Sequence, residues 1–294
     1  MSPASRSALA DVAGLLACPE CGLGFEPQDR VLRCGTGHSF DIARQGYVSL
    51  LTGASTKMTG DTAAMLDARA AFQSGGHFAP IAAAVAAAVG STSGTVLEIG
   101  AGTGYYLAGV LDAAPDANGI ALDVAKSAAR RGARAHPRAA SVLADAWRGL
   151  PIRDGALSRV LSVFAPRNPG EAARVLAADG SFVIATPTER HLAELIGPLG
   201  MVTVDPDKDR RLGEAMSGHF DALDRAVVEY SMKLGRADVA HVVGMGPSGH
   251  HADVSDDPRI AAMPETVEVT ASVLVSTYRP QPSWAGRQGL RTRS

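Results

Sequence analysis

The sequence has few cysteines, few aromatic residues and no long apolar run. Only three of the 294 residues are cysteines, and 5% are aromatic. An odd number of cysteines disfavours a disulfide framework and makes a metal site the more natural use of them. No apolar run of about 18 residues is present, so we expect no membrane-spanning helix and no membrane partner. The first residues also lack the long apolar segment of a secretory signal, which predicts a cytoplasmic location.

The charges nearly balance. The formal net charge is −2, and 20% of the residues are charged. This balance gives no overall indication of nucleic-acid binding, although a local basic patch matters more than the sum. The hydrophobic fraction of 46% over this length suits a globular protein with one large domain and one small one.

All three cysteines lie in one short stretch near the start of the chain. Cys18, Cys21, Cys34 and His38 follow the pattern C-x2-C-x12-C-x3-H. The two ligand pairs, Cys18 with Cys21 and Cys34 with His38, would each lie on a tight turn. Together they can place three thiolates and one imidazole at the corners of a tetrahedron, which is typical of a closed structural zinc site. The alternative is three ordinary buried cysteines and a surface histidine. We expect Leu15-Leu16 and 31–33 to be strands that lead into the two turns.

A strand-like segment runs into three closely spaced glycines. The segment 95–99 is followed by Gly100, Gly102 and Gly104, and a helical pattern begins immediately afterwards. A strand that turns sharply into a helix on glycines can bind a nucleotide-like cofactor, because no Cβ blocks its approach. A dinucleotide-binding turn would need its last glycine at Tyr105, so the spacing disfavours NAD.

The next apolar run, 120–122, ends in Asp123, where a second parallel strand would offer a carboxylate to a ribose diol. These features resemble motifs I and II of class I S-adenosylmethionine-dependent methyltransferases. The resemblance implies an α/β, Rossmann-like fold with a mostly parallel sheet and an antiparallel last strand. It also implies that the glycine turn, including Thr103, binds S-adenosylmethionine and that Glu98 holds either the turn or the methionine amino group. A glycine-rich loop without a cofactor is the alternative.

Further strands are expected along the catalytic part. The third, 141–144, ends at Asp145, which would accept a hydrogen bond from the adenine amine or else cap a turn. The fourth and fifth strands are expected at 158–164 and 181–187, and a helix at 189–195. The last two strands, 225–234 and 265–278, are expected to be antiparallel and joined by a helix through His241 and the loop 244–251.

A wider resemblance covers most of the chain, from Cys18 to about Leu195. The cysteine pattern is followed by "FDIARQGYVSLL" up to Leu51, then by Gly60-Asp61 and by "GGHF", which ends at Phe78. This order is similar to that of the 23S ribosomal RNA guanine-N1 methyltransferases of the RlmA and TlrB type. The resemblance implies methylation of N1 of a guanosine in a domain II hairpin of 23S rRNA, and macrolide resistance of the tylosin or mycinamicin type.

The same resemblance implies that Phe78 borders the cofactor pocket and that His191 contacts the cofactor. Without it, Phe78 would equally be a core aromatic at a helix start, and His191 a surface histidine. Guanine N1 must lose a proton, and we name Glu171 and Asp145 as candidate bases. The target base must leave its stack to react. The alternatives are a small-molecule methyltransferase and a non-catalytic RNA-binding protein with this fold.

We expect four regions along the chain. They are a zinc-ribbon RNA-recognition module (1–52), a helical linker (53–90), the methyltransferase domain (91–280) and a basic flexible tail (281–294). In the linker, one helix would be capped by Asp61 or Thr62 and a second would follow Pro80. The oligomeric state stays open between a monomer and a homodimer.

Overall fold

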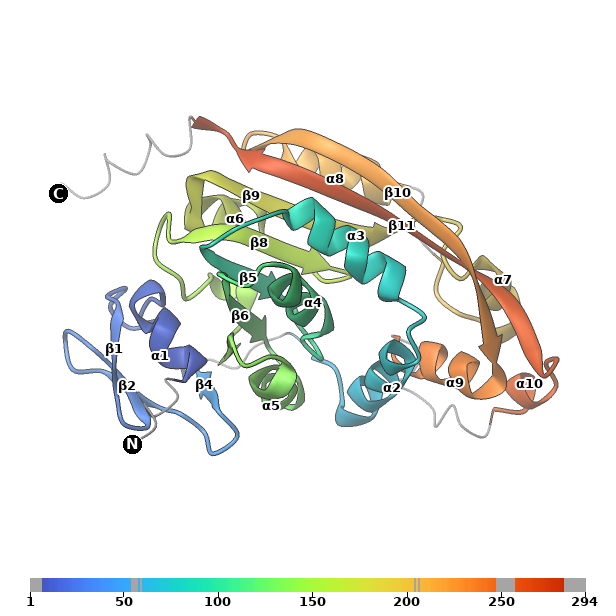
Figure 1. The fold of residues 1–294 in the computed structure, drawn as a ribbon, viewed down its shortest axis with the longest axis horizontal. Coiled ribbons are helices and arrows are strands. Elements are labelled where there is room, and N and C mark those ends of the chain that lie inside the picture. Colours follow the sequence, from blue (N-terminus) through green and yellow to red (C-terminus); the bar gives the residue numbers. More distant parts are fainter. Residues whose placement is uncertain are drawn as a thin grey trace.

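The structure is a computed structural model that describes residues 7–53, 58, 60–203, 205, 207–246 and 257–282. In these ranges, helices cover both faces of one large sheet (Figure 1). The strand order is β10-β11-β9-β8-β5-β6-β7-β4. The strand bounds are β4 Tyr47–Ser49, β5 Thr95–Ile99, β6 Asn118–Asp123, β7 Ala139–Leu143, β8 Leu157–Val163, β9 Leu176–Pro187, β10 Phe220–Gly235 and β11 Thr266–Pro280.

Neighbouring strands run parallel from β9 across to β4, whereas β11 is antiparallel to both β9 and β10. The predicted mostly parallel sheet with an antiparallel last strand is therefore confirmed. A parallel sheet aligns the carboxyl ends of its strands along one edge, and ligands of open α/β folds bind at that edge.

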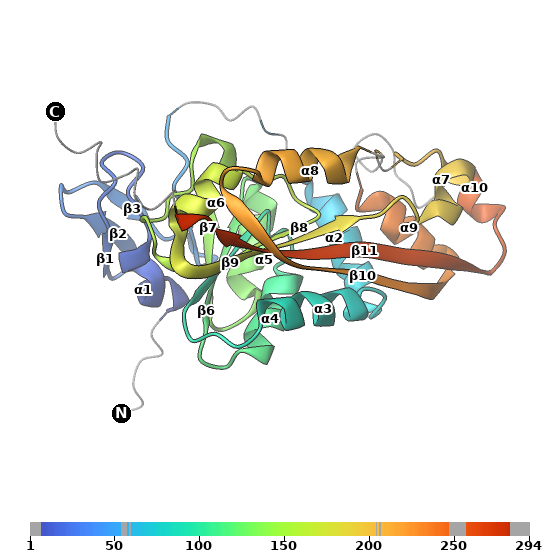
Figure 2. The same cartoon turned by 90° about the horizontal axis from the view of Figure 1, so that it is seen from above.

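The central strands of the large sheet send alternate side chains to two separate cores. Val96 packs into the core under α3 and α4, whereas its neighbour Leu97 packs into the core under α1, α6 and α8. Figure 2 shows α3 and α8 on opposite sides of the sheet. The bounds are α1 Ala8–Val12, α3 Ala79–Val89, α4 Tyr105–Ala113, α5 Lys126–Ala135, α6 Pro169–Val175 and α8 Lys208–Met216.

The N-terminal part forms a small antiparallel sheet in the order β1-β2-β3, with β1 Phe25–Gln28, β2 Val31–Cys34 and β3 Ser39–Asp41. The chain then leaves this sheet and adds β4 to the edge of the large sheet beside β7. Of the strand expected at Leu15-Leu16, only Leu16 pairs as β-structure, in an isolated bridge with Ile152. The segment Ala13–Leu15 is a 3-10 helix (η1) because the Leu16 N–H bonds back to the Ala13 carbonyl.

The linker contains the two expected helices. In α2 (Ala63–Ser74), the Thr62 side chain caps the first turn by accepting from the Met65 N–H, and Gly75 follows the last residue. In α3, Pro80 lies in the first turn, where its missing N–H costs nothing. Both helices pack on the catalytic part: α3 contacts α4 and β9, and α2 contacts α5 and α9.

The last two strands form a long hairpin-like pair that carries α9 (Arg236–Gly244) at its far end (Figure 1). Two short helices, α7 (Ala193–Leu199) and α10 (Pro258–Ala261), lie beside it. The helix expected from Glu189 starts only at Ala193, because the Leu192 N–H bonds to Thr270 of β11 and holds the preceding turn against that strand. Residues 247–251 of the expected loop 244–251 and residues 283–294 of the expected tail 281–294 lie outside the described residues.

Candidate functional site

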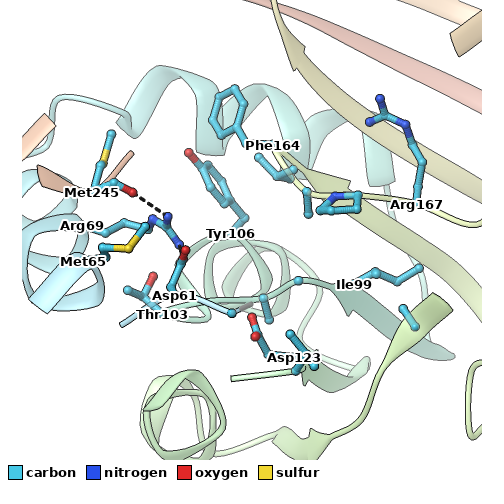
Figure 3. Close-up of a pocket in the computed structure, with 18 of the residues that line it drawn as sticks. Asp61, Met65, Arg69, Ile99, Thr103, Tyr106, Asp123, Phe164, Arg167 and Met245 are labelled. Atoms are coloured by element: carbon cyan, nitrogen blue, oxygen red, sulfur yellow. Dashed lines mark hydrogen bonds and ion pairs between the residues drawn. The ribbon is translucent and has the colours of Figure 1, made fainter. Parts of the chain in front are cut away.

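A cavity of about 470 Å³ opens at the carboxyl ends of β5, β6, β7 and β8, against the glycine turn (Figure 3). Residues from the ends of these four strands and from α2 line it. The predicted cofactor residues in its lining are Phe78, Gly100, Thr103, Asp123, Asp145 and His191. Sequence reasoning thus named residues that the fold brings together from distant parts of the chain.

The glycine turn requires glycine for conformation and for space. Gly102 and Gly104 have φ angles of 55° and 78°, in the left-handed region that other residues rarely adopt. A Cβ on Gly104 would come within 2.5 Å of the Ala135 Cβ, and one on Gly102 within 2.9 Å of Nη1 of Arg69. The turn therefore lies tightly between α5 and α2, and Gly102 and Gly104 shape the turn rather than line the cavity.

Glu98 lies beneath the turn and not in the cavity lining. Its side chain is 1% exposed, and Oε2 accepts from the Leu107 N–H at 3.0 Å. Burial, with the nearby Asp123 charge, raises the pKa of this carboxyl from 4.5 to about 8, and the bond from Leu107 only partly opposes the rise. Of the two roles expected for Glu98, its position supports holding the turn.

Asp123 ends β6 and contacts the turn directly. Its Oδ2 accepts from the Gly102 N–H and its Oδ1 from the Ala125 N–H, each at 2.9 Å. Burial raises the pKa of Asp123 despite these two bonds. Each carboxylate oxygen has a second lone pair, so both can still accept from a ligand hydroxyl.

The two carboxylates expected as bases occupy different places. Asp145 follows β7, is 6% exposed and lines the cavity, and its Oδ1 also accepts from the Trp147 N–H at 3.0 Å. Glu171 lies on α6 outside the cavity lining. Its carboxylate is bound to Arg174 and the Leu150 N–H, each at 2.7 Å, and although burial opposes the change, these bonds lower its pKa. The position of Glu171 does not support a role as base at this cavity.

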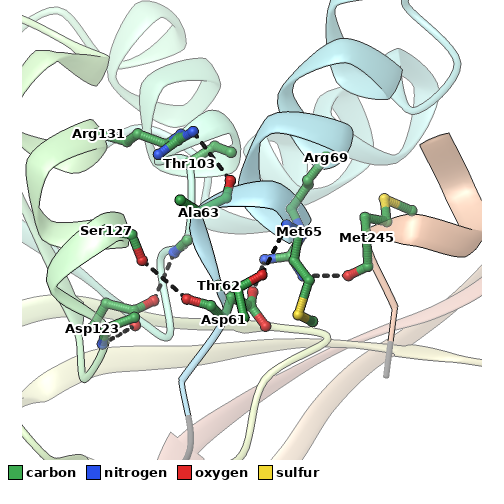
Figure 4. A network of polar contacts seen from close by, with 12 residues as sticks. Asp61, Thr62, Ala63, Met65, Arg69, Thr103, Asp123, Ser127, Arg131 and Met245 are labelled. Atoms are coloured by element: carbon green, nitrogen blue, oxygen red, sulfur yellow. Dashed lines mark hydrogen bonds and ion pairs between the residues drawn. The ribbon is translucent and has the colours of Figure 1, made fainter. Parts of the chain in front are cut away.

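Residues of α2 line the cavity beside the turn, and Figure 4 shows their polar contacts. Arg69 Nη1 pairs with Asp61 at 2.5 Å, and its Nη2 donates to the carbonyl of Met245, the residue after α9, at 2.9 Å. At the C-terminal half of the helix, Thr103 Oγ1 donates to Gln73 Oε1 at 2.7 Å. The helix expected to be a linker is therefore part of the site.

Four aromatic rings meet on the side of the cavity next to β8. Phe78, at the start of α3, is 2% exposed, so it is both a core aromatic and a cavity residue. His191 stacks on Phe164 at 5.7 Å and 25°, and the rings of Phe78 and Tyr106 lie 6.1 and 6.2 Å from Phe164. The His191 Nδ1 accepts from the Ser272 N–H at 3.2 Å, so in the neutral ring Nε2 carries the proton.

Sequence reasoning did not identify Arg69, Tyr106 or Phe164 as site residues. Arg69 lies in a helix that precedes the recognised motif by some thirty residues, so only tertiary packing brings it to the turn. Tyr106 directly follows the glycine turn, which was the available signal. Its hydroxyl is buried without a hydrogen-bond partner among the described residues, and burial raises the pKa of this phenol well above its ordinary value.

The four predicted metal ligands converge in the ribbon. Cys18, Cys21, Cys34 and His38 each offer an atom, and these atoms all lie within 4.8 Å of one another. The Cys21 and Cys34 sulfurs are 3.6 Å apart, and the Cys34 sulfur is 3.4 Å from the His38 Nδ1. Ligands about 2.3 Å from a tetrahedral zinc ion are separated by distances of this size. The group therefore fits a closed structural zinc site.

No helix in the described ranges is long and apolar enough to cross a membrane.

A glycine turn after the central strand, carboxylates after the next two strands and an antiparallel strand in this order define a class I S-adenosylmethionine-dependent methyltransferase fold. A solved structure shares the fold: a putative methyltransferase in complex with the Trm112 activator of Haloferax volcanii covers 76% of this chain and 99% of its own, with a TM-score of 0.50 and 16% identity.

A family model described as "RlmA, N-terminal", a zinc ribbon, matches residues 16–55. The putative 23S rRNA (guanine-N1)-methyltransferase of Micromonospora griseorubida is 45% identical over 92% of this chain and 99% of its own length. The 23S rRNA (guanine(748)-N1)-methyltransferase of Streptomyces fradiae is 44% identical with the same coverage. The chain belongs to the 23S rRNA (guanine-N1)-methyltransferase family.

Proposed function

We propose that this protein transfers the methyl group of S-adenosylmethionine to N1 of a guanosine in 23S rRNA, in the domain II hairpin that contains position 748. The observation that carries the proposal is the pairing of a cavity built on the glycine turn with 44–45% identity, over nearly the whole chain, to methyltransferases named for this reaction. We further propose that the methylation gives resistance to macrolides of the tylosin or mycinamicin type.

The cofactor would lie across the ends of three neighbouring strands. Asp123 after β6 faces the position expected for ribose hydroxyls, and Asp145 after β7 faces the position expected for the adenine amine. Phe78 and His191 border the same cavity. When bound, the cofactor supplies an electrophilic methyl group on a sulfonium.

We propose that Arg69 receives the methionine carboxylate. Its guanidinium lines the cavity beside Gly102, and Arg binds carboxylates through paired N–H donors. Asp61, already paired with Arg69, places a negative charge next to that cation. An adjacent cation and anion are complementary to the carboxylate and ammonium of an amino acid.

The tasks of the protein in this reaction are to hold the guanine against the methyl group and to exclude water. As N1 gains the methyl group, its proton would pass to a base, and Asp145 is the candidate base that lines the cavity. The apolar rings of Phe78, Tyr106 and Phe164 would exclude water from their side of the cavity, and residues of α2 line another side. The zinc ribbon, with its β4 extension on the large sheet, would position the RNA.

The test is a methylation assay with labelled S-adenosylmethionine on a 23S domain II transcript. We expect one methyl group per transcript at N1 of a guanosine, seen as a primer-extension stop and lost when that guanosine is replaced by adenosine. Methylation of phenol or quinone acceptors without RNA activity would support a small-molecule methyltransferase. No heat of binding with S-adenosylhomocysteine would support a non-catalytic RNA-binding protein.

A further inference from the structure

The residue after β8 has an unusual backbone and an exposed aromatic side chain. Phe164 has a φ of 55°, in the left-handed region that bulky residues rarely occupy. Its side chain is nonetheless 39% exposed, so burial of the ring does not explain this conformation. Residues held in such conformations cluster at ligand-binding sites, where the surrounding structure fixes them.

The surroundings of Phe164 do fix it. Its N–H donates to the Ala185 carbonyl of β9 at 3.0 Å, and the Ser162 hydroxyl donates to the Ala165 carbonyl at 3.1 Å. A Cβ on Gly100 would come within 2.6 Å of the Ala165 Cβ, so this loop lies directly on the glycine turn. The backbone that carries the ring is therefore held at a fixed place relative to the glycine turn, and the ring itself packs against His191.

Phe164 lies on one side of the glycine turn, and the two aspartates expected to bind the cofactor lie on the other. In the sheet, β8 is next to β5 on the side away from β6 and β7, which carry Asp123 and Asp145. Figure 3 shows Phe164 across the cavity from Asp123. In the same view, Tyr106 lies between Phe164 and Arg69 of α2. An acceptor molecule must approach from the side that the ribose and adenine do not occupy.

We propose that the Phe164 ring, backed by His191, is the platform on which the flipped-out guanine stacks during methyl transfer. The inference rests on the proposed function. Flipped bases are held by stacking on aromatic side chains, and a ring that is 39% exposed and stacks at 25° on a second ring can offer such a face. Nothing else among the described cavity residues combines a fixed aromatic ring, partial exposure and a place at the end of β8.

The test compares four variants of Phe164 in the full-length protein, with S-adenosylhomocysteine affinity by calorimetry and steady-state kinetics on the 23S transcript. Phe164→Ala and Phe164→Gly are expected to lower kcat/KM for RNA by about 10- to 100-fold, the usual effect of losing one base–aromatic stack. Phe164→Tyr and Phe164→Trp are expected to stay within about fivefold of the parent. All four are expected to keep cofactor-product affinity within about threefold, because the ring is on the acceptor side.

The Ala and Gly variants separate stacking from backbone strain. Both lack the ring, but glycine adopts a φ of 55° without strain, so Phe164→Gly is expected to have the higher Tm of the two with the same loss on RNA. Leu223→Ala is the matched control, since it truncates an apolar side chain that is 48% exposed on β10 and does not line the cavity.

A loss of S-adenosylhomocysteine affinity of tenfold or more in Phe164→Ala would assign the ring to the cofactor and overturn the inference. Unchanged RNA kinetics in that variant would overturn it as well. Failure of the proposed function gives a different result, because the parent protein would then not methylate RNA at all.

Discussion

Replacing Glu98 with glutamine tests how this buried carboxyl supports the glycine turn. Burial raises the pKa of Glu98 from 4.5 to about 8, which corresponds to about 5 kcal/mol at ~1.4 kcal/mol per pH unit. Because the folded-state pKa is above the unfolded one, the associated stability is fully present below pH 4.5 and is lost as the pH rises toward 8. Glutamine keeps an acceptor oxygen for the Leu107 N–H but does not ionise when the chain unfolds.

We therefore expect Glu98→Gln to be more stable than the parent by an amount that grows from pH 5 to pH 8, toward roughly 3–5 kcal/mol. The measurement is urea unfolding at several pH values in that interval, with zinc present throughout. Glu268→Gln, on an exposed position of β11, serves as the control and is expected to change stability by less than about 0.5 kcal/mol at every pH.

The same variant separates the two roles expected for Glu98. If the side chain holds the turn as a neutral acceptor, affinity for S-adenosylhomocysteine stays within about threefold of the parent. A gain in stability that does not depend on pH, together with a tenfold or greater loss of affinity, would refute the reasoning. It would mean that Glu98 is ionised in the folded protein and contacts the cofactor.

Three further predictions concern the turn, the cation and the ribbon. Gly104→Ala is expected to destabilise the fold by at least about 2 kcal/mol, because Gly104 has a φ of 78° and its Cβ would come within 2.5 Å of Ala135. The control, Gly109→Ala in the open middle of α4, is expected to stabilise the fold by about 0.5–1 kcal/mol. Equal Tm values for the two variants would contradict this prediction. Arg69→Gln is expected to lower the affinity for S-adenosylhomocysteine about 10-fold or more but to leave the affinity for 5′-methylthioadenosine, which lacks the carboxylate, unchanged. The control is Arg131→Gln, which removes an ion pair of α2 outside the cavity lining. Equal losses of affinity for both ligands in Arg69→Gln would assign Arg69 a structural role. Cys34→Ser is expected to abolish stoichiometric zinc binding, measured by metal analysis, and to lower RNA methylation. Binding of S-adenosylhomocysteine is expected to persist, because the ribbon does not line the cavity. Full zinc occupancy in this variant would exclude Cys34 as a ligand.

Local patterns were enough to predict most helices and strands. The glycine spacing after 95–99 predicted the strand, the turn and the helix, since positive φ angles are a local property of those residues. The candidate caps Asp61 and Thr62 predicted the start of α2, and Pro80 predicted the start of α3 to within a residue or two. The segment 189–192 was predicted as helix but is not, because the Leu192 N–H and the His191 ring bond to β11, about 80 residues away in sequence.

The sequence by itself determined the glycine turn, the Cys3His group and the parallel strands whose ends carry Asp123 and Asp145. Each of these features depends on how many residues separate its members along the chain, and those separations can be read directly from the sequence. Only the tertiary structure decided that α2 covers the turn with Arg69, that Glu171 is bound by Arg174 away from the cavity, and that Phe164 faces the acceptor side. These contacts join segments that are far apart in the chain or depend on which way a side chain points, so no local periodicity or motif encodes them.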